Sequence, residues 1–385
     1  METDRFLLIK AWSYILWSDV DHVLGLLLVA ELTGRIPVIY WPTHYLNNGF
    51  VQTNGFELYF EPINSYTIHN LSKPEYTYYP PIWNYDNLMV DDNARDTLVY
   101  RNIGDILCSK ANVVVADIFY NIYELIPFIG KNHTGYGMAP EQIYRYLLGK
   151  YIKIKPDIEM EIQGYYNSWI KGNHPVLAVH VRRANKEDTD ENGKDSEDNK
   201  ISKGSKSSKV KKSSRREKKE SKFRRRLSGK DKYEEQNRLY HGEIHKYIKK
   251  YSIRKIFLLT DCQSTLREYG ELYGPMLIHT DCKRLQSGED ISLMENPMIS
   301  RRRGIEIIKD TYIASRCDFF IGNEFSSLSR AVVRLKEWPD KSVKLLYRLY
   351  KKQKYPVNAD LPDKDKDGIF SRLVNMVKRL MGRGR

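Results

Sequence analysis

The chain has 385 residues, more than one ordinary hydrophobic core accommodates, so two domains are expected. Apolar residues make up 41% and aromatic residues 12% of the sequence, which is enough to build buried cores and excludes a wholly disordered chain. The formal net charge of +14 favours anionic partners such as nucleotides, nucleic acid or acidic lipid headgroups, without choosing among them.

The four cysteines lie far apart and form no CxxC pair, so the sequence indicates neither a zinc site nor a disulfide framework, and no metal is expected. The first residues are acidic with only a short apolar run, which differs from a cleaved secretory signal. No stretch approaches the roughly 20 apolar residues that span a bilayer. We therefore expect a cytoplasmic protein, either free or peripherally attached to a membrane.

The first half of the chain alternates strand and helix signals. A strand at residues 6–9 precedes a helix at 20–33, whose apolar residues recur at helical spacing and whose end is marked by Gly34. Further strands are predicted at 36–41 and 113–118. This strand–helix–strand order predicts a parallel sheet.

Two other stretches complete the first half. Residues 43–84 contain many Asn, Pro and Tyr residues without a clear period, and we interpret them as a long surface excursion. Residues 140–151 and 158–170 have helical patterns, and we place the domain boundary directly after them. The predicted first domain is therefore 1–170.

The same alternation returns in the second half, from residue 171 to residue 350. The predicted elements are a strand at 176–181, a helix at 233–251, strands at 255–260 and 277–280, a helix at 304–315 and a strand at 319–322. The predicted fold class is α/β, with two Rossmann-like domains whose parallel sheets face a cleft.

Two charged segments interrupt this pattern. Residues 186–232 contain 18 basic and 10 acidic side chains and almost no large apolar ones, so we predict a disordered insertion at 187–232. A solvated tether is the simpler interpretation, and binding to nucleic acid or an acidic membrane is the alternative. The tail at 351–385 contains a basic amphipathic helix, which fits either docking on the protein itself or contact with an anionic membrane. Nucleic acid is the less expected partner, because aromatic residues that could stack on bases are scarce in the insertion.

Polar side chains follow the strand at 176–181, where the sequence reads HVRR. Ligands of parallel sheets bind where strands end, and His180, Arg182 and Arg183 occupy that position. Guanidinium groups match phosphate oxygens bidentately, so a diphosphate is the natural ligand of this pair. An exposed arginine pair without a ligand is the alternative.

Three further features point to a nucleotide. Asp261 ends the strand at 255–260, and Asp310 lies on the helix at 304–315, where a carboxylate can accept the ring N–H and exocyclic amine of guanine. Ser326 and Ser327 open another helix, whose amide groups can bind phosphate oxygens. Taken alone, Asp310 fits a helix surface charge equally well.

The stretches HVRRANK, LLTDCQS and GIEIIKDTYIASRCDFFIGNEFSSLSR occur in this order between residues 176 and 335. They resemble the three motifs of the α-1,6-fucosyltransferases and the related nodulation fucosyltransferases, which share an HxRRTDK signature. Residues 17–35 resemble the first helix of that family more weakly. The resemblance implies a two-domain GT-B enzyme that uses no metal or other cofactor and transfers fucose from GDP-fucose to a sugar hydroxyl of a glycan, with inversion.

The resemblance also implies roles for individual residues. His180 and Asp310 match guanine-recognising positions, and Arg182 matches the arginine on the β-phosphate. The other matches lie around the donor: Arg183 and Lys186 flank Arg182, Asp261 is an acidic position, and Ser326 and Ser327 contact the phosphates. The first domain then lies on the acceptor side and the second binds the nucleotide sugar.

The sequence departs from the family pattern at three places. Asn185 replaces the aspartate of RRTDK, and Cys262 replaces a second acidic residue after Asp261. The general base falls in the insertion, where Glu187, Asp188 and Asp190 are the candidates and the sequence does not choose among them. These departures leave open weak activity, another acceptor or another sugar.

An acceptor site is expected in the first domain, where Trp17, Asp19 and His22 cluster at a helix start, beside Asp21. Capping of that helix by Ser18 or Asp19 is the alternative interpretation. The leading hypothesis for the whole chain is a fucosyltransferase-like enzyme. The alternatives are a transferase of another GDP-sugar, and a non-catalytic GT-B-like protein that binds nucleic acid or acidic membrane through its basic insertion.

Overall fold

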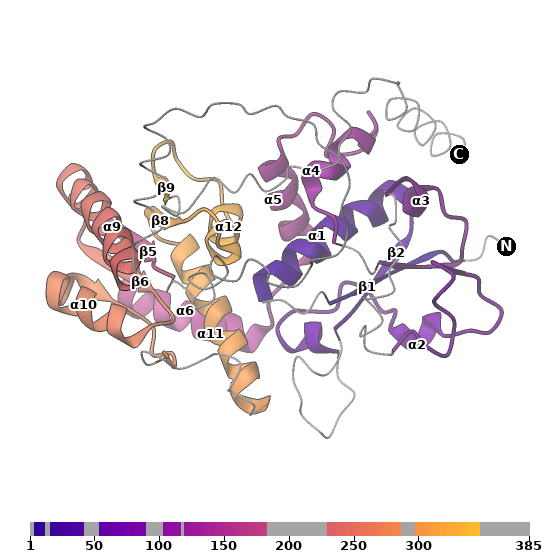
Figure 1. The fold of residues 1–385 in the computed structure, drawn as a ribbon, viewed down its shortest axis with the longest axis horizontal. Helices are drawn as coiled ribbons and strands as arrows, with labels where there is room; N and C mark the ends of the chain where they lie inside the picture. The colour runs from indigo at the N-terminus through magenta and orange to yellow at the C-terminus, as the bar shows by residue number, and fades with distance from the viewer. Residues whose placement is uncertain are drawn as a thin grey trace, which may run out of the picture.

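The computed structural model describes residues 4–11, 16–41, 54–89, 103–116, 119–182, 229–285 and 297–346, without the side chains of 229–235 and 297–300. Two α/β units lie side by side along the long axis of the molecule (Figure 1). Most of the predicted insertion and the whole predicted tail lie outside these residues. No helix of the described ranges has both the length and the apolar character needed to cross a membrane.

The amino-terminal unit contains a four-stranded parallel sheet in the order β2-β1-β4-β3. Its strands are β1 (Phe6–Lys10), β2 (Ile36–Tyr40), β3 (Tyr78–Tyr79) and β4 (Val113–Ala116). All residues of β1 and β4 are buried, as the continuous apolar runs of a parallel sheet covered on both faces predict.

Helix α1 (Leu16–Thr33) connects β1 to β2 and is buried along almost its whole length. A helix that is apolar on every side belongs in a core, and this one packs against α3, α4, α5 and α12. Gly25 permits a close approach of the segment just before α4, because a Cβ at this position would lie 2.1 Å from the carbonyl oxygen of Tyr120.

The carboxy-terminal unit contains a five-stranded parallel sheet in the order β7-β6-β5-β8-β9. Its strands are β5 (Val176–His180), β6 (Lys255–Leu259), β7 (Leu277–Ile278), β8 (Phe319–Asn323) and β9 (Val343–Leu346). The chain builds outward from β5 to β7 and then returns to add β8 on the other side of β5. Ligands of such sheets bind beside the carboxyl ends of the two strands where this reversal occurs.

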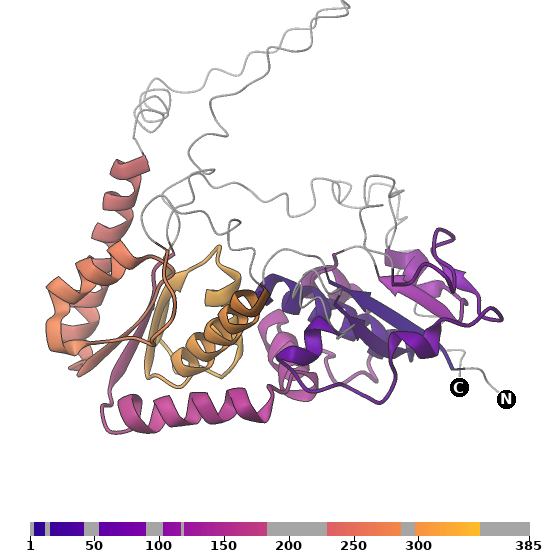
Figure 2. The ribbon, with the colours of Figure 1, turned by 90° about the horizontal axis from the view of Figure 1, so that it is seen from below.

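Helices cover both faces of this sheet (Figure 2). On one face, α9 (Gly229–Tyr251) and α10 (Gln263–Tyr273) pack on alternate residues of β5, β6 and β8. On the other face, α11 (Pro297–Ser315) and α12 (Ser327–Arg334) cover the remaining residues of the same strands. Helix α6 (Pro156–Tyr165) packs against α11. The predicted division between residues 170 and 171 stays a prediction.

The shorter elements lie mainly in the amino-terminal unit. They are η2 (Gly55–Leu58), α2 (Ile68–Leu71), α3 (Ile103–Cys108), α4 (Ile122–Leu125), η4 (Ile126–Phe128), α5 (Pro140–Tyr151), η5 (Tyr166–Ile170) and, in the second unit, η6 (Gly274–Met276).

Several sequence predictions need correction. The prediction of a surface excursion at residues 43–84 is wrong for the described part of that stretch. The buried residues there are Phe56, Phe60, Leu71 and Trp83. The insertion ends earlier than residue 232, since α9 begins at Gly229. The two-residue strand β3 and the edge strand β9 were not predicted, because neither has the long apolar run that marks an inner strand.

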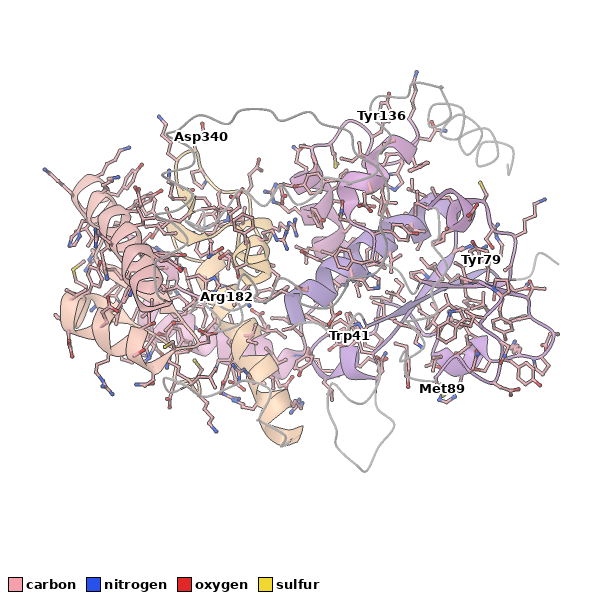
Figure 3. The ribbon with its side chains drawn as sticks, viewed as in Figure 1. Trp41, Tyr79, Met89, Tyr136, Arg182 and Asp340 are labelled. Carbon is pink, nitrogen blue, oxygen red and sulfur yellow. The ribbon has the colours of Figure 1, made fainter. Side chains whose placement is uncertain are left out.

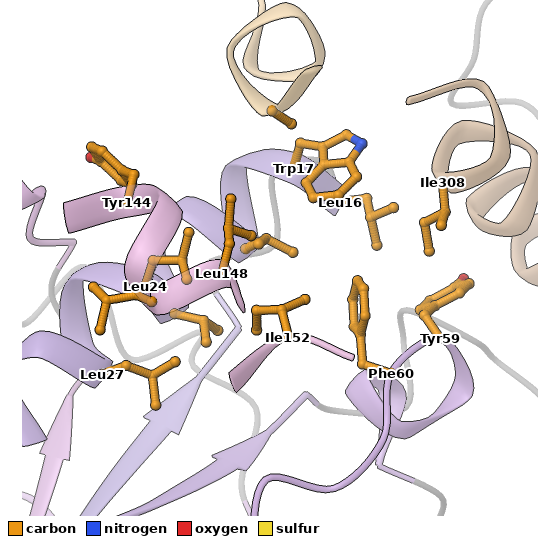
Figure 4. Packing of buried hydrophobic residues seen from close by; sticks show 14 of the residues in the cluster. Leu16, Trp17, Leu24, Leu27, Tyr59, Phe60, Tyr144, Leu148, Ile152 and Ile308 are labelled. Carbon is orange, nitrogen blue, oxygen red and sulfur yellow. The ribbon is translucent and has the colours of Figure 1, made fainter. Parts of the chain in front are cut away.

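One hydrophobic core extends through both units. Figure 4 shows Leu16 and Trp17 of α1 beside Ile308 of α11, with Phe60 of the amino-terminal unit beneath them. The Trp17 indole donates a hydrogen bond of 2.8 Å to Thr311 Oγ1 on α11. The two units are therefore held together by apolar packing as well as by polar contacts.

A buried arginine makes polar contacts between the two units. Arg334 at the end of α12 is 2% exposed, and it donates to Asp21 Oδ1 at 2.6 Å and to Glu141 Oε2 at 2.8 Å. Its guanidinium also lies over the Tyr144 ring, 3.4 Å from the centroid. Burial raises the pKa of Asp21 even though the Arg334 charge opposes that rise.

We expect Arg334→Met to lower the free energy of unfolding by roughly 3 kcal/mol, because it leaves the carboxylate of Asp21 buried without its closest partner. The matched control is Arg330→Met, since Arg330 is 45% exposed and lies 3.7 Å from the same carboxylate. The control substitution should lower the free energy of unfolding by less than about 1 kcal/mol. Urea denaturation at neutral pH measures both, and equal losses for the two variants would show that Arg334 is no more than a surface ion pair.

Candidate functional site

The candidate site lies at the carboxyl edge of the second sheet, where β5 and β8 are neighbours. Their pairing sets Leu177 opposite Phe319 and Val179 opposite Ile321, so both strands end at the same level. The residues that follow β5 and the turn that leads from β8 into α12 therefore lie next to each other. Figure 3 labels Arg182 at this edge, between the second sheet and the amino-terminal unit.

His180 is the last residue of β5 and is 6% exposed. Its Nδ1 lies 2.7 Å from the hydroxyl oxygen of Ser329 on α12. Burial lowers the pKa of His180 to about 3, and the charge of Arg182 acts in the same direction. The imidazole is therefore neutral at physiological pH.

Arg182 follows two residues later and is half-buried. Its guanidinium makes no hydrogen bond or ion pair with any residue of the described ranges. Arginine carries five N–H donors in a fixed plane, so a partly enclosed guanidinium without an internal partner is suited to an anionic ligand.

Ser326 and Ser327 begin α12 beside the end of β5. Both are buried, at 3% and 4% exposed, and no hydrogen bond within the described part of the chain engages either hydroxyl. The preceding turn is fixed by Asn323, whose side chain accepts from the Phe325 N–H at 2.9 Å. Free hydroxyls and the first amide groups of a helix favour a bound anion, and Arg182 supplies a positive charge at the same edge of the sheet.

Asp310 forms a second polar group, on α11. Its carboxylate accepts a hydrogen bond of 2.5 Å from Thr280 Oγ1, just after β7, and is 7% exposed. Arg284, also buried, donates to the Thr280 carbonyl oxygen at 2.9 Å and contributes a positive charge near the carboxylate. Burial nevertheless raises the pKa of Asp310 to about 6.

Asp261 follows β6 and is half-buried. Its carbonyl oxygen accepts from the Leu285 N–H at 2.8 Å, and Leu285 in turn accepts from the Gln263 N–H at 3.0 Å. These bonds place the segment that carries Arg284 alongside the end of β6. Hydrogen bonds from Ser264 and Thr265 lower the pKa of the neighbouring Cys262 thiol, although burial opposes them.

The predicted site residues of the second unit thus lie at one edge of one sheet, in two groups. His180, Arg182, Ser326 and Ser327 surround the ends of β5 and β8, and Asp261 and Asp310 lie by β6 and β7. Arg183, Lys186 and Asp190 lie outside the described residues, as do Asn185, Glu187 and Asp188.

The predicted acceptor residues lie in the core. Trp17, Asp19 and His22 are 2%, 0% and 0% exposed. The Trp17 indole is bonded to α11, and His22 Nε2 lies 3.1 Å from the Lys10 carbonyl oxygen while its ring stacks on Phe119. None of the three presents a surface to an acceptor in this structure, because α1 is buried on all sides.

Sequence reasoning missed three residues of this edge: Thr280, Arg284 and Ser329. Thr280 ends a predicted strand and Ser329 lies in the third motif, so the sequence places both residues near the site but indicates no role for either. Arg284 carried no signal, because its position depends on the backbone bonds of Asp261. Within the described residues, no group of three or more His, Cys, Asp or Glu side chains is arranged to hold a metal ion.

No protein-family model and no curated protein sequence matches this chain. Among solved structures it is similar to NodZ alpha-1,6-fucosyltransferase soaked with GDP-fucose, with a TM-score of 0.50 and 17% identity over 86% of this chain and 93% of that one. The GDP co-crystal of NodZ has a TM-score of 0.50 and 16% identity, over 86% and 92% of the two chains. Fucosyltransferase NodZ from Bradyrhizobium has a TM-score of 0.49 and 17% identity, over 86% and 92%. At such identities a likeness shows the fold, so the chain has the GT-B-like fold with two parallel sheets, as predicted.

The buried carboxylate of Asp310 should make the stability of the fold depend on pH. The pKa of Asp310 in the folded protein, about 6, exceeds the ordinary value of 3.8. The contribution of this group to the free energy of unfolding is therefore fully present below pH 3.8 and is lost as the pH rises through about 6. Between about pH 5 and about pH 8 we expect Asp310→Asn to become more stabilising relative to wild type by about 1 kcal/mol.

Urea midpoints of wild type and Asp310→Asn at the two pH values measure this difference. Asp281→Asn is the control, because it removes an exposed carboxylate from the same segment and should keep the wild-type pH dependence. A pH dependence that is identical in wild type and Asp310→Asn would contradict the assignment.

Proposed function

We propose that this protein is an inverting, metal-independent glycosyltransferase that moves fucose from GDP-fucose to a hydroxyl of a glycan acceptor. One observation carries the proposal: a half-buried guanidinium and two buried hydroxyls, all without partners in the described residues, follow the two neighbouring strands at which the order of a parallel sheet reverses. The fold it shares with NodZ, which has been crystallised with GDP and soaked with GDP-fucose, supports the same donor.

The transfer requires that negative charge be stabilised as it develops on the diphosphate. The acceptor oxygen forms a bond to the anomeric carbon of the sugar while the bond from that carbon to the diphosphate oxygen breaks, and GDP leaves. Arg182 and the first amides of α12 would stabilise the departing diphosphate, aided by Ser326 and Ser327. A carboxylate takes the acceptor proton, and Asp190, in the segment that follows β5, is our candidate beside Glu187 and Asp188.

Base recognition falls to the second polar group. An ionised Asp310 accepts the ring N–H and exocyclic amine of guanine, and His180 reads another edge of the base. Arg183 and Lys186 are assigned to the donor phosphates and Asp261 to the donor sugar. The proposal includes a cytoplasmic location, with contact to an anionic membrane assigned to residues 187–232 or 351–385.

Guanine nucleotides should stabilise the purified protein against heat, because a ligand that binds only the folded state raises its melting temperature. Arg182→Ala should weaken GDP binding at least about tenfold while leaving the unliganded melting temperature unchanged, since Arg182 has no internal partner. The control is Arg254→Ala, which removes an exposed arginine at the opposite end of the sheet.

Thermal shift and calorimetry with GDP, GDP-fucose, GDP-mannose and ADP measure these effects. Absence of a shift with every guanine nucleotide would overturn the proposal and favour a binding role for the basic insertion. Transfer from GDP-mannose but not from GDP-fucose would keep the site and correct the sugar.

Affinity for GDP should rise with pH, because guanine requires the ionised form of Asp310 and burial raises the pKa of that group to about 6 in the free protein. Binding then releases a proton, and the dissociation constant should fall about tenfold between about pH 5 and about pH 7. Asp310→Asn should bind more weakly and lose this part of the pH dependence. The phosphates of GDP also ionise with pH, but they do so equally for wild type and variant, so the difference between the two pH profiles reports Asp310 alone. If wild type and Asp310→Asn show the same pH dependence of GDP affinity, Asp310 takes no part in base recognition.

A further inference from the structure

A buried hydroxyl joins the turn after β8 to the histidine at the end of β5. Ser329 on α12 is 0% exposed, and its Oγ lies 2.7 Å from His180 Nδ1 and 3.0 Å from the backbone nitrogen of Asn323. Gly322 makes this approach possible, because a Cβ there would lie 2.7 Å from the same oxygen. The hydroxyl is therefore held between two strands that are neighbours in the sheet.

The protons of this arrangement can be assigned from donors and acceptors. The Asn323 N–H has only a proton to offer, so it donates to Ser329 Oγ. The hydroxyl then has its own proton left to donate, and within the described residues His180 Nδ1 is the acceptor that receives it. An Nδ1 that accepts carries no hydrogen, so a neutral ring must carry its hydrogen on Nε2.

The opposite tautomer is disfavoured by burial. With a hydrogen on Nδ1, Ser329 would accept from both His180 and Asn323, and its own proton would have no partner in the described part of the chain. A buried donor left without a partner costs about 1–3 kcal/mol. Because burial also keeps the ring neutral, with a pKa of about 3, the doubly protonated form does not compete.

We propose that Ser329 is a positioning residue that fixes His180 as the Nε2–H tautomer, so that the ring presents a hydrogen-bond donor to the nucleobase of the donor substrate. The inference deepens the proposed function and rests on it. A donor at this place suits a 6-oxopurine, which offers a carbonyl oxygen. A 6-aminopurine offers an amine at the same atom, and two donors that face each other repel.

The tautomer can be measured in the free protein by nitrogen-15 NMR of the histidine rings, with His180→Gln used to assign the His180 signals among the nine histidines. We expect wild type to show a protonated Nε2 and an unprotonated, hydrogen-bonded Nδ1. Ser329→Ala should give a mixture of tautomers. A wild-type ring that carries its hydrogen on Nδ1 would overturn the proposal, and this reading does not depend on any Ser329 variant.

Binding of GDP and ADP measures the consequence. Ser329→Ala should reduce the preference for GDP over ADP about tenfold, chiefly by weakening GDP, and Ser329→Thr should restore both the tautomer and the preference. Ser315→Ala is the matched control, since it removes another buried helix hydroxyl, bonded to the Tyr312 carbonyl oxygen on α11. It should leave the preference as in wild type.

Equal losses for GDP and ADP in Ser329→Ala would show that the hydroxyl only supports the turn, and would overturn the positioning role. An unchanged preference despite mixed tautomers would do the same. Failure of the wild type to bind any guanine nucleotide would instead overturn the proposed function, together with the base-reading role. The spectrum of the free protein still tests the tautomer by itself.

Discussion

The parallel pairing of β5 with β8 is the constraint on which the candidate site depends. Parallel strands end at the same edge of a sheet, so residues 149 positions apart in sequence, His180 and Ser329, become hydrogen-bond partners. The same pairing places Arg182 and the first turn of α12 at the same edge of the sheet. The fully buried hydroxyl of Ser329 accepts from the Asn323 N–H, whereas the half-buried guanidinium of Arg182 has no partner within the described residues.

The buried carboxylate of Asp310 makes this edge of the sheet less stable than an apolar side chain in a well-packed core would. Asp310 is buried, and its carboxylate is ionised only at a cost that its hydrogen bond to Thr280 and the charge of Arg284 do not fully offset, as its raised pKa shows. An asparagine at this position would avoid the cost of ionisation, but its side chain offers one acceptor oxygen where the carboxylate offers two. Perturbed titratable groups of this kind are enriched at functional sites because function keeps them there despite their cost.

The strands and helices of the second unit could be predicted because their apolar runs are long and end in polar residues. The runs at β5, β6 and β8 gave both the fold class and the edge that carries His180 and Asp261. The burial of α1 could not be predicted in the same way, because the polar start at Trp17 and Asp19 suggests exposure. The packing of helices from both units around α1 reverses that. Arg284 and Ser329 needed the sheet order, since their partners are distant in sequence.

Helix α12 links the carboxyl edge of the second sheet to the contact between the two units. Its first turn carries Ser326 and Ser327, and its last turn carries Arg334, which is bonded to Asp21 and Glu141 of the amino-terminal unit. Eight residues of helix form a short connection, so any displacement of the first turn along the helix axis would either move α1 as well or break a buried ion pair. The cost of breaking that pair favours the first outcome. Under the proposed function, in which a diphosphate binds at the first turn of α12, this short helix would couple binding of the donor to the relative position of the two units.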